Sequence, residues 1–235
     1  MQTLNVIYED NHIIVVLKPQ NVLSQGDETG DESLLDMVKN YIKQKYQKTG
    51  NVYVGLVHRL DRPTGGVMVF AKTSKAASRL SEQLKNKQFS KKYLAVVVGT
   101  PKYSNARLEH FLVKDEQNNT VRVCPRTVAG AKQAILEYNT ISSIGGVSLL
   151  NVKILTGRSH QIRVQTSQIG TPVFGDTKYG GDSLAKGHNL ALWAYELEFV
   201  HPTTRQPMKF KYVPPIKTTP WNVFEKEIIE IEKSI

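Results

Sequence analysis

The segment His58–Gly66 contains the residues whose types and spacing are best suited to chemistry. It reads His-Arg-Leu-Asp-Arg-Pro-Thr-Gly-Gly and places one carboxylate, Asp61, between two arginines. The apolar run Gly66–Ala71 that follows is typical of a strand buried on both faces, so we expect Asp61 at the start of this strand, at the edge of a core. An isolated buried charge is costly, so the carboxylate needs hydrogen bonds or a cation. Arg59 and Arg62 are the nearest cations, although strand alternation would send Arg62 to the opposite face.

Two interpretations of Asp61 are open from this segment alone. A structural ion pair or a turn aspartate is the usual role of an Asp close to Pro and Gly. A reacting carboxylate is the other interpretation, and segments elsewhere in the chain favour it. Phe89–Gly99 reads Phe-Ser-Lys-Lys-Tyr-Leu-Ala-Val-Val-Val-Gly, and Leu155–Val164 reads Leu-Thr-Gly-Arg-Ser-His-Gln-Ile-Arg-Val.

With these three segments the chain resembles a pseudouridine synthase of the RluA type. The resemblance continues in the same order through three further stretches, which are Ile14–Pro19, Gly175–Gly180, and Leu192–Ala194 ahead of His201–Pro202. The matches span roughly residues 6 to 213. The resemblance implies an enzyme that isomerises specific uridines in ribosomal or transfer RNA to pseudouridine.

The resemblance also implies roles for three residues. Asp61 corresponds to the family's single catalytic aspartate, which serves as the nucleophile, and one carboxylate suffices because no water must be activated, unlike in most glycosidases. Arg158 corresponds to the arginine that pairs with this aspartate, where a guanidinium would keep it ionised and oriented. Tyr93 corresponds to the tyrosine that stacks on the target base and has been assigned a part in proton transfer at C5. Without the resemblance, Tyr93 would be an ordinary core residue.

Base flipping is the second implication, because uridine is buried in stacked or paired RNA. Arg59 matches the residue that some family members insert into the RNA, while an ion pair with Asp61 is its alternative role. Leu192 is a weak candidate for the base pocket. The predicted RNA-binding residues are Arg59, Arg62, Lys72, Lys85, Lys87, Lys91, Lys92 and Arg163.

The charge balance agrees with an RNA partner. Lys and Arg outnumber Asp and Glu by 31 to 21, which gives a net charge of +10 and a pI near 9.5. This excess favours a polyanion. Between Lys72 and Lys92 the chain has seven basic residues against one acid, Glu82. A solvated helix face is the alternative explanation of that run, and its position between the Asp61 and Tyr93 segments favours an RNA-binding flank.

Several classes of function are disfavoured by what the sequence lacks. The one cysteine, Cys124, permits no internal disulfide, and His58, His160 and His201 have no metal-ligand spacing, so we expect neither metal nor cofactor. The N-terminus does not begin a signal peptide and no apolar stretch approaches 18 residues, so we expect a cytoplasmic protein with no membrane partner. The oligomeric state is left open, with a monomer as the default. Two rival functions stay open, a catalytically silent RNA-binding protein of the same fold and a sugar- or nucleotide-processing hydrolase. The target RNA and uridine are not specified, and Trp193 and Gly65 depart from common family residues.

Alternating apolar patterns joined by turns predict an α+β domain on a long, bent, mixed and mostly antiparallel sheet. The resemblance implies the pseudouridine synthase fold, with flanking helices and a central catalytic cleft. We expect residues 1–235 to form a single bilobed catalytic domain, without a separate N-terminal RNA-binding domain. Strands are expected at Ile13–Leu17, Gly66–Ala71, Tyr93–Val98, Thr120–Val123, Ala134–Ile141, Val147–Leu155, Leu190–Val200 and Met208–Val213. Helices are expected at Ser33–Lys48, from a cap at Ser74, at Ser159–Ile169 capped by Ser159, and at Trp221–Ile235.

Overall fold

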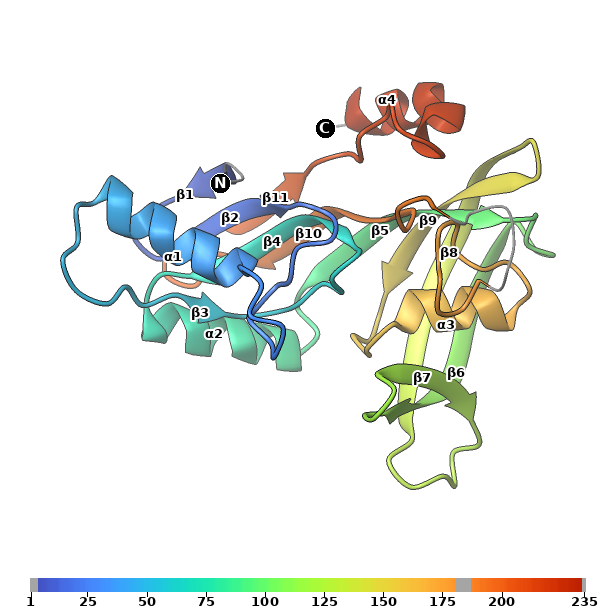
Figure 1. Ribbon diagram of the computed structural model, residues 1–235, viewed down its shortest axis with the longest axis horizontal. Helices are drawn as coiled ribbons and strands as arrows, with labels where there is room; N and C mark the ends of the chain where they lie inside the picture. The colour runs from blue at the N-terminus through green and yellow to red at the C-terminus, as the bar shows by residue number, and fades with distance from the viewer. Residues whose placement is uncertain (1–3, 181–186, 234–235) are drawn as a thin grey trace. The chain divides into compact units, whose positions relative to one another are not determined.

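The computed structural model describes residues 4–180 and 187–233, and its chain forms two compact units (Figure 1). The first unit holds Met1–Phe89 and Glu196–Tyr212, and the second holds Ser90–Tyr195 and Val213–Ile235. Each unit combines strands with helices, which confirms the α+β class. The single bilobed domain and the central cleft stay predictions.

The first unit is built on antiparallel strands with two helices. β2 pairs with both β1 and β4, and β3 pairs with Phe70 and Ala71 at the end of β4. Strand β10 runs through the unit boundary, and its part in the first unit pairs with β11. The bounds are β1 (Asn5–Glu9), β2 (Ile13–Lys18), α1 (Leu34–Lys45), β3 (Gly55–Leu56), β4 (Gly65–Ala71), α2 (Ser74–Lys85), β10 (Leu192–Val200) and β11 (Pro207–Lys211).

Strand β4 is buried at every position, which confirms the prediction from its apolar sequence. Its register places Val69 opposite Val15 of β2, and both join an apolar cluster with Leu80 of α2. The next residue, Phe70, is opposite Ile14 on the other face of the strands, and both are fully buried. Each such side chain contributes roughly 1.5–3 kcal/mol to folding, so this pair of strands is a firm base for the residues that precede β4.

The two helices of this unit begin at side-chain caps. Ser33 caps α1 in a reciprocal capping box with Asp36, within the predicted helix, although α1 ends at Lys45 rather than at residue 48. The predicted cap of α2 at Ser74 is wrong, because the hydroxyl of Thr73 accepts the amide hydrogen of Ala76 at 3.1 Å. Ser74 is therefore the first residue of the helix.

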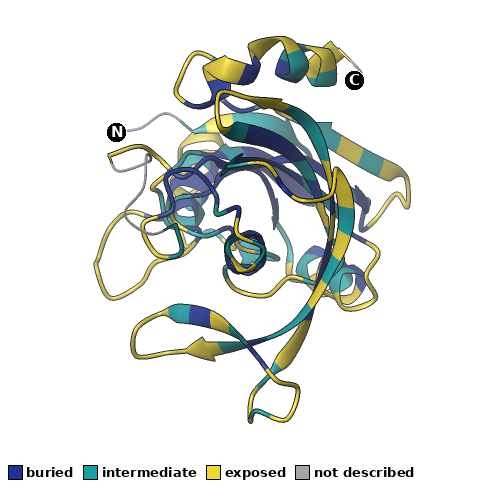
Figure 2. Ribbon diagram, turned by 90° about the vertical axis from the view of Figure 1, so that its right-hand side faces the viewer, coloured by how far each residue is buried: buried dark blue, intermediate teal, exposed yellow. Residues whose placement is uncertain are grey.

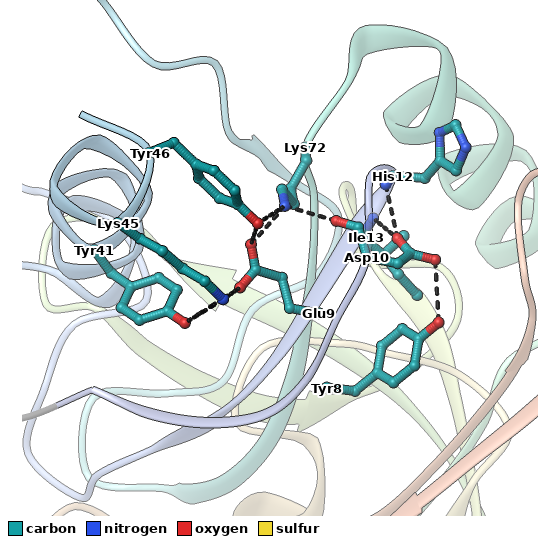
Figure 3. A network of polar contacts seen from close by, with 9 residues as sticks. All are labelled: Tyr8, Glu9, Asp10, His12, Ile13, Tyr41, Lys45, Tyr46 and Lys72. Carbon is teal, nitrogen blue, oxygen red and sulfur yellow. Dashed lines mark hydrogen bonds and ion pairs between the residues drawn. The ribbon is translucent and has the colours of Figure 1, made fainter. Parts of the chain in front are cut away.

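A hydrogen-bonded network around Glu9 ties α1 to the strands (Figure 3). The Glu9 carboxylate accepts from Lys45 Nζ at 2.6 Å, from Lys72 Nζ at 2.5 Å and from the Tyr46 hydroxyl at 2.9 Å. Burial acts to raise the pKa of Glu9, but these hydrogen bonds outweigh it and lower the pKa from 4.5 to about 2. Glu9 therefore holds the end of α1 and the residue after β4 against β1.

In the second unit, antiparallel strands follow the order β5-β9-β8-β6-β7. Helix α3 packs against β6 and β7 of this sheet (Figure 1). The β6–β7 turn at residues 116–119 is exposed (Figure 2). The bounds are β5 (Ser90–Val98), β6 (Asn105–Asp115), β7 (Thr120–Cys124), β8 (Lys132–Ile144), β9 (Val147–Ile154), α3 (Gln161–Gln168), the 3-10 helix η1 (Trp221–Phe224) and α4 (Glu225–Lys233).

Several predicted elements of the chain need correction. Helix α3 starts at Gln161, and the predicted cap at Ser159 is wrong because the residue before the helix is His160, which has φ of 50° and makes no side-chain cap. The predicted helix Trp221–Ile235 is a 3-10 turn followed by α4, and residues 234–235 lie outside the described part. Strands β1, β3 and β6 were not predicted.

Replacing Glu9 by Gln tests the network. At pH 7 we expect Glu9→Gln to lower the free energy of unfolding by about 2 kcal/mol, because hydrogen bonds to a charged acceptor are replaced by weaker ones. The folded pKa of about 2 lies below the unfolded value of 4.5, so this contribution is complete above pH 4.5 and disappears as the pH falls towards 2. Urea denaturation across this range measures it. Glu116→Gln, at an exposed ion pair with Lys114, is the control and should change little; equal effects of both variants would contradict the role of Glu9.

Candidate active site

Asp61 lies in a tight turn rather than on the strand. The amide of Thr64 donates to the Asp61 carbonyl at 2.9 Å, and β4 begins only at Gly65. The prediction that Asp61 starts the strand is therefore wrong by four residues, because Pro63 cannot donate a strand hydrogen bond and favours a turn. The strand-alternation argument about Arg62 fails for the same reason. The Asp61 side chain is half-buried at the edge of the core, as expected.

Lys18, the last residue of β2, holds this turn in place through hydrogen bonds to its backbone carbonyls. It is fully buried, and its ammonium donates to the carbonyls of Pro19 at 3.0 Å, Arg62 at 2.9 Å and Thr64 at 2.8 Å. Three hydrogens meet three acceptors, which matches the charged form. Burial nevertheless lowers the pKa of Lys18 to about 7, even though the negative charge of Asp61 acts to raise it. The turn is thus held by the Lys18 ammonium. Burial disfavours the charged form of this group, and hydrogen bonds to three carbonyls stabilise it.

Residues just after β2 hold the other side of the turn. The Ser24 hydroxyl donates to the Leu60 carbonyl at 2.7 Å and accepts from the Leu60 amide at 3.1 Å. The Gln20 amide donates to the Pro63 carbonyl at 3.1 Å. Backbone groups on both sides of Asp61 therefore have side-chain partners, which leaves the turn little freedom.

The two arginines that flank Asp61 differ in their surroundings. Arg62 forms an ion pair with Asp31 at 2.6 Å and donates to the Asn21 carbonyl at 3.2 Å. Arg59 is exposed. Arg62 therefore has a partner 31 residues away in the sequence, Asp31, whereas Arg59 lies at the surface beside the turn.

In the second unit, Tyr93 is buried on β5, with 7% of its surface exposed, opposite Val152 of β9. Because side chains alternate along a strand, Lys91 projects from the same face as Tyr93, whereas Lys92 projects from the other. Leu192, the proposed base-pocket residue, is buried at the start of β10.

Arg158 is an exposed residue of the loop between β9 and α3. Its Nε donates to the Gln133 carbonyl of β8 at 2.9 Å, and its backbone amide donates to the side chain of Gln161 at 3.0 Å. Gln161 also accepts from the Thr156 hydroxyl at 2.8 Å. The first residue of α3 thereby shapes the loop that carries Arg158.

Arg163 and Lys72, both predicted to bind RNA, have partners within the protein. Arg163 is 4% exposed, and its guanidinium donates twice to Asp176, with both distances 2.7 Å. Lys72 belongs to the Glu9 network, and 11% of its side chain is exposed. Lys85 and Lys87, at and just beyond the end of α2, are exposed. Arg163 is thus buried in contact with Asp176, and the RNA-binding role of these residues stays a prediction.

Sequence reasoning missed two of the groups that shape this region. Lys18 had a signal, since a lysine at the end of an apolar strand must find acceptors if it is buried. Asp176 lies in the stretch Gly175–Gly180, which supported the resemblance, but its partner was not predictable from spacing. Among the described residues, no three His, Cys, Asp or Glu side chains form a group that could hold a metal ion, and no helix is long and apolar enough to cross a membrane.

Comparison with known proteins gives consistent matches. The family model described as RNA pseudouridylate synthase matches residues 12–168. The chain is 34% identical over 197 residues to ribosomal large subunit pseudouridine synthase D of Borreliella burgdorferi, which covers 82% of this chain and 60% of that protein. It is 32% identical to ribosomal large subunit pseudouridine synthase C of Vibrio vulnificus, covering 87% and 64%. The chain thus spans less than two thirds of the length of these relatives.

The fold has a solved counterpart. A human protein described as RNA pseudouridylate synthase domain containing 4 superposes with a TM-score of 0.77 at 23% identity, covering 96% of this chain and 93% of that one. At this identity the match concerns the fold, and it confirms the predicted pseudouridine synthase fold.

Lys18→Met tests whether the buried ammonium fixes the turn. The substitution leaves three buried carbonyls without their shared donor, so we expect a loss of roughly 1–3 kcal/mol in the free energy of unfolding. Hydrogen exchange at the Thr64 amide, which closes the turn, should become faster than in the wild type. Lys75→Met on the exposed face of α2 is the matched control. An unchanged rate of hydrogen exchange at the Thr64 amide would show that the turn is stable without the Lys18 ammonium.

Proposed function

Because the chain belongs to the RNA pseudouridylate synthase family, we propose that it isomerises uridine to pseudouridine in ribosomal RNA. The observation that carries this proposal is the family match over residues 12–168, which includes Asp61, Tyr93 and Arg158. The names of the relatives favour ribosomal RNA, and transfer RNA is the second substrate to test. We place the proposed reaction in the cytoplasm, because the relatives named above are bacterial proteins.

The reaction breaks the bond between N1 of uracil and C1′ of ribose, turns the base, and joins C5 to C1′. The proton lost from C5 is balanced by one gained at N1, so the product is an isomer and no co-reactant is needed. A carboxylate can support the electron-poor C1′ or add to the ring, and we assign this role to Asp61. Support for the assignment comes from the turn, whose backbone is held by Lys18, Ser24 and Gln20 and so presents one orientation.

Tyr93 and the basic residues complete the proposal. We assign Tyr93 to stacking on the flipped base, with its hydroxyl available for proton transfer at C5. Arg59, exposed beside the turn, is assigned to the space that the flipped base leaves in the RNA. Exposed Lys85 and Lys87 suit phosphate contacts better than Lys72 or Arg163, which have protein partners.

Asp61→Asn tests the enzyme proposal against the alternative of a catalytically silent RNA-binding protein. The variant keeps the shape of the side chain and removes its charge, so we expect folding and RNA binding to persist while turnover falls to background. Tritium release from RNA labelled at C5 of uridine measures turnover. Asp115→Asn, at an exposed position of β6, is the control and should retain the wild-type rate. Lack of activity in the wild type on ribosomal and transfer RNA would favour the silent alternative, and activity of Asp61→Asn would refute the mechanism.

A second prediction concerns the arginine that acts with Asp61. We assign Arg158, whose exposed guanidinium donates through Nε to the Gln133 carbonyl, whereas the buried Arg163 is paired with Asp176. We expect Arg158→Ala to fold normally and to lose about a hundredfold in kcat. Arg163→Ala should instead lose roughly 3–5 kcal/mol in the free energy of unfolding, since it leaves Asp176 buried and unpaired. Wild-type kcat in Arg158→Ala would refute the assignment of Arg158.

A further inference from the structure

Lys91 differs from the other lysines of the basic flank. Its side chain is half-buried on β5, and burial lowers the pKa of its amine below the usual value, with no neighbouring charge acting to restore it. Within residues 4–180 and 187–233, its ammonium has no hydrogen-bond acceptor or carboxylate partner from the protein. A desolvated cation in this position is stabilised only by an anion or acceptor from outside the chain.

Gly157 keeps the space next to this ammonium open. A side chain at residue 157 would place its Cβ 3.6 Å from Lys91 Nζ, in van der Waals contact with it. The next residue, Arg158, brings a second cation, whose guanidinium is anchored through Nε to the Gln133 carbonyl. Neither cation forms an ion pair with a carboxylate of the described residues.

The position relative to Tyr93 gives this cation a place in the proposed reaction. Residues 91 and 93 project from the same face of β5, because the strand is regular and pairs with β9 through Lys92 and Tyr93. An anion held at Lys91 would therefore lie on the Tyr93 side of the sheet. A uridine stacked on Tyr93 has a phosphodiester group on either side of its ribose, within reach of such a cation.

We propose that Lys91, beside Gly157 and Arg158, forms a binding site for one phosphodiester group of the nucleotide that stacks on Tyr93. This inference rests on the proposed function for the identity of the ligand. An ordinary surface lysine meets phosphates as a mobile, hydrated charge and contributes alike to all RNA. A partly desolvated lysine on the Tyr93 face instead fixes one phosphate relative to the base.

Lysine NMR gives a test that does not require turnover. In protein with 13C-labelled lysines, the ε-methylene signal of Lys91 is identified by its loss in Lys91→Arg. Addition of inorganic phosphate at constant ionic strength should shift this signal in a saturable manner and raise the pKa of Lys91, because a bound anion favours the ammonium. The signal of exposed Lys75 is the control and should not saturate. The dinucleotide uridylyluridine should act as phosphate does, whereas its uncharged methylphosphonate analogue should not.

Kinetics on RNA supply the second arm. Lys91→Met should raise KM about tenfold with little change in kcat, since the phosphate is held in both the ground and transition states. Lys91→Arg should retain most of the affinity, and Lys226→Met, at an exposed position of α4 outside the basic flank, should match the wild type. A Lys91 signal that moves no more than that of Lys75, in an enzyme that turns over, overturns the phosphate site alone. Saturable binding of uridylyluridine without turnover on any RNA would instead refute the proposed function and leave the site in place.

Discussion

The buried ammonium of Lys18 is the interaction on which the arrangement around Asp61 depends. A lone cation in an apolar core is unfavourable, and this one is tolerated because three carbonyls, two of them from the turn, accept its three hydrogens. The same bonds give the turn carbonyls a partner that neither β2 nor β4 could supply. The ammonium and the carbonyls therefore depend on each other, and the position of the half-buried Asp61 is determined by a cation inside the core.

The sequence was sufficient for elements whose information is local. Burial of β4 follows from its run of apolar residues, and the start of α1 follows from Ser33 ahead of an apolar helical pattern. It was not sufficient for β6, where His110 interrupts the apolar series Ala106, Leu108 and Leu112, and Phe111 and Val113 occupy positions that alternation would make polar. The helix cap at Thr73 was missed because Thr73 and Ser74 are equally good caps by composition and only the backbone angles decide between them.

The candidate site divides in the same way. Asp61 could be selected from its own segment, with Tyr93 and Arg158 following from the resemblance. The side chains that hold the Asp61 turn in place could not be selected from the sequence. Lys18 and Ser24 lie 36 or more residues from the groups they bind in the turn. The roles of the basic residues were equally hard to predict, because the net charge does not distinguish a cation that is paired within the protein from one that is available to RNA. Lys72 and Arg163 are held by Glu9 and Asp176, and only the structure separates them from Lys91.

The Arg163–Asp176 pair restricts how this sequence can change over evolutionary time. Both side chains are almost completely buried and joined by two hydrogen bonds, and Asp176 also accepts from the amides of Lys178 and Tyr179. Replacing either residue alone leaves the other as an unpaired buried charge. A protein with only one of the two substitutions is therefore the least stable form on any evolutionary path that changes both residues. Positions 163 and 176 should therefore vary together or not at all, which makes them a fixed point for aligning distant relatives where the surrounding loop differs in length.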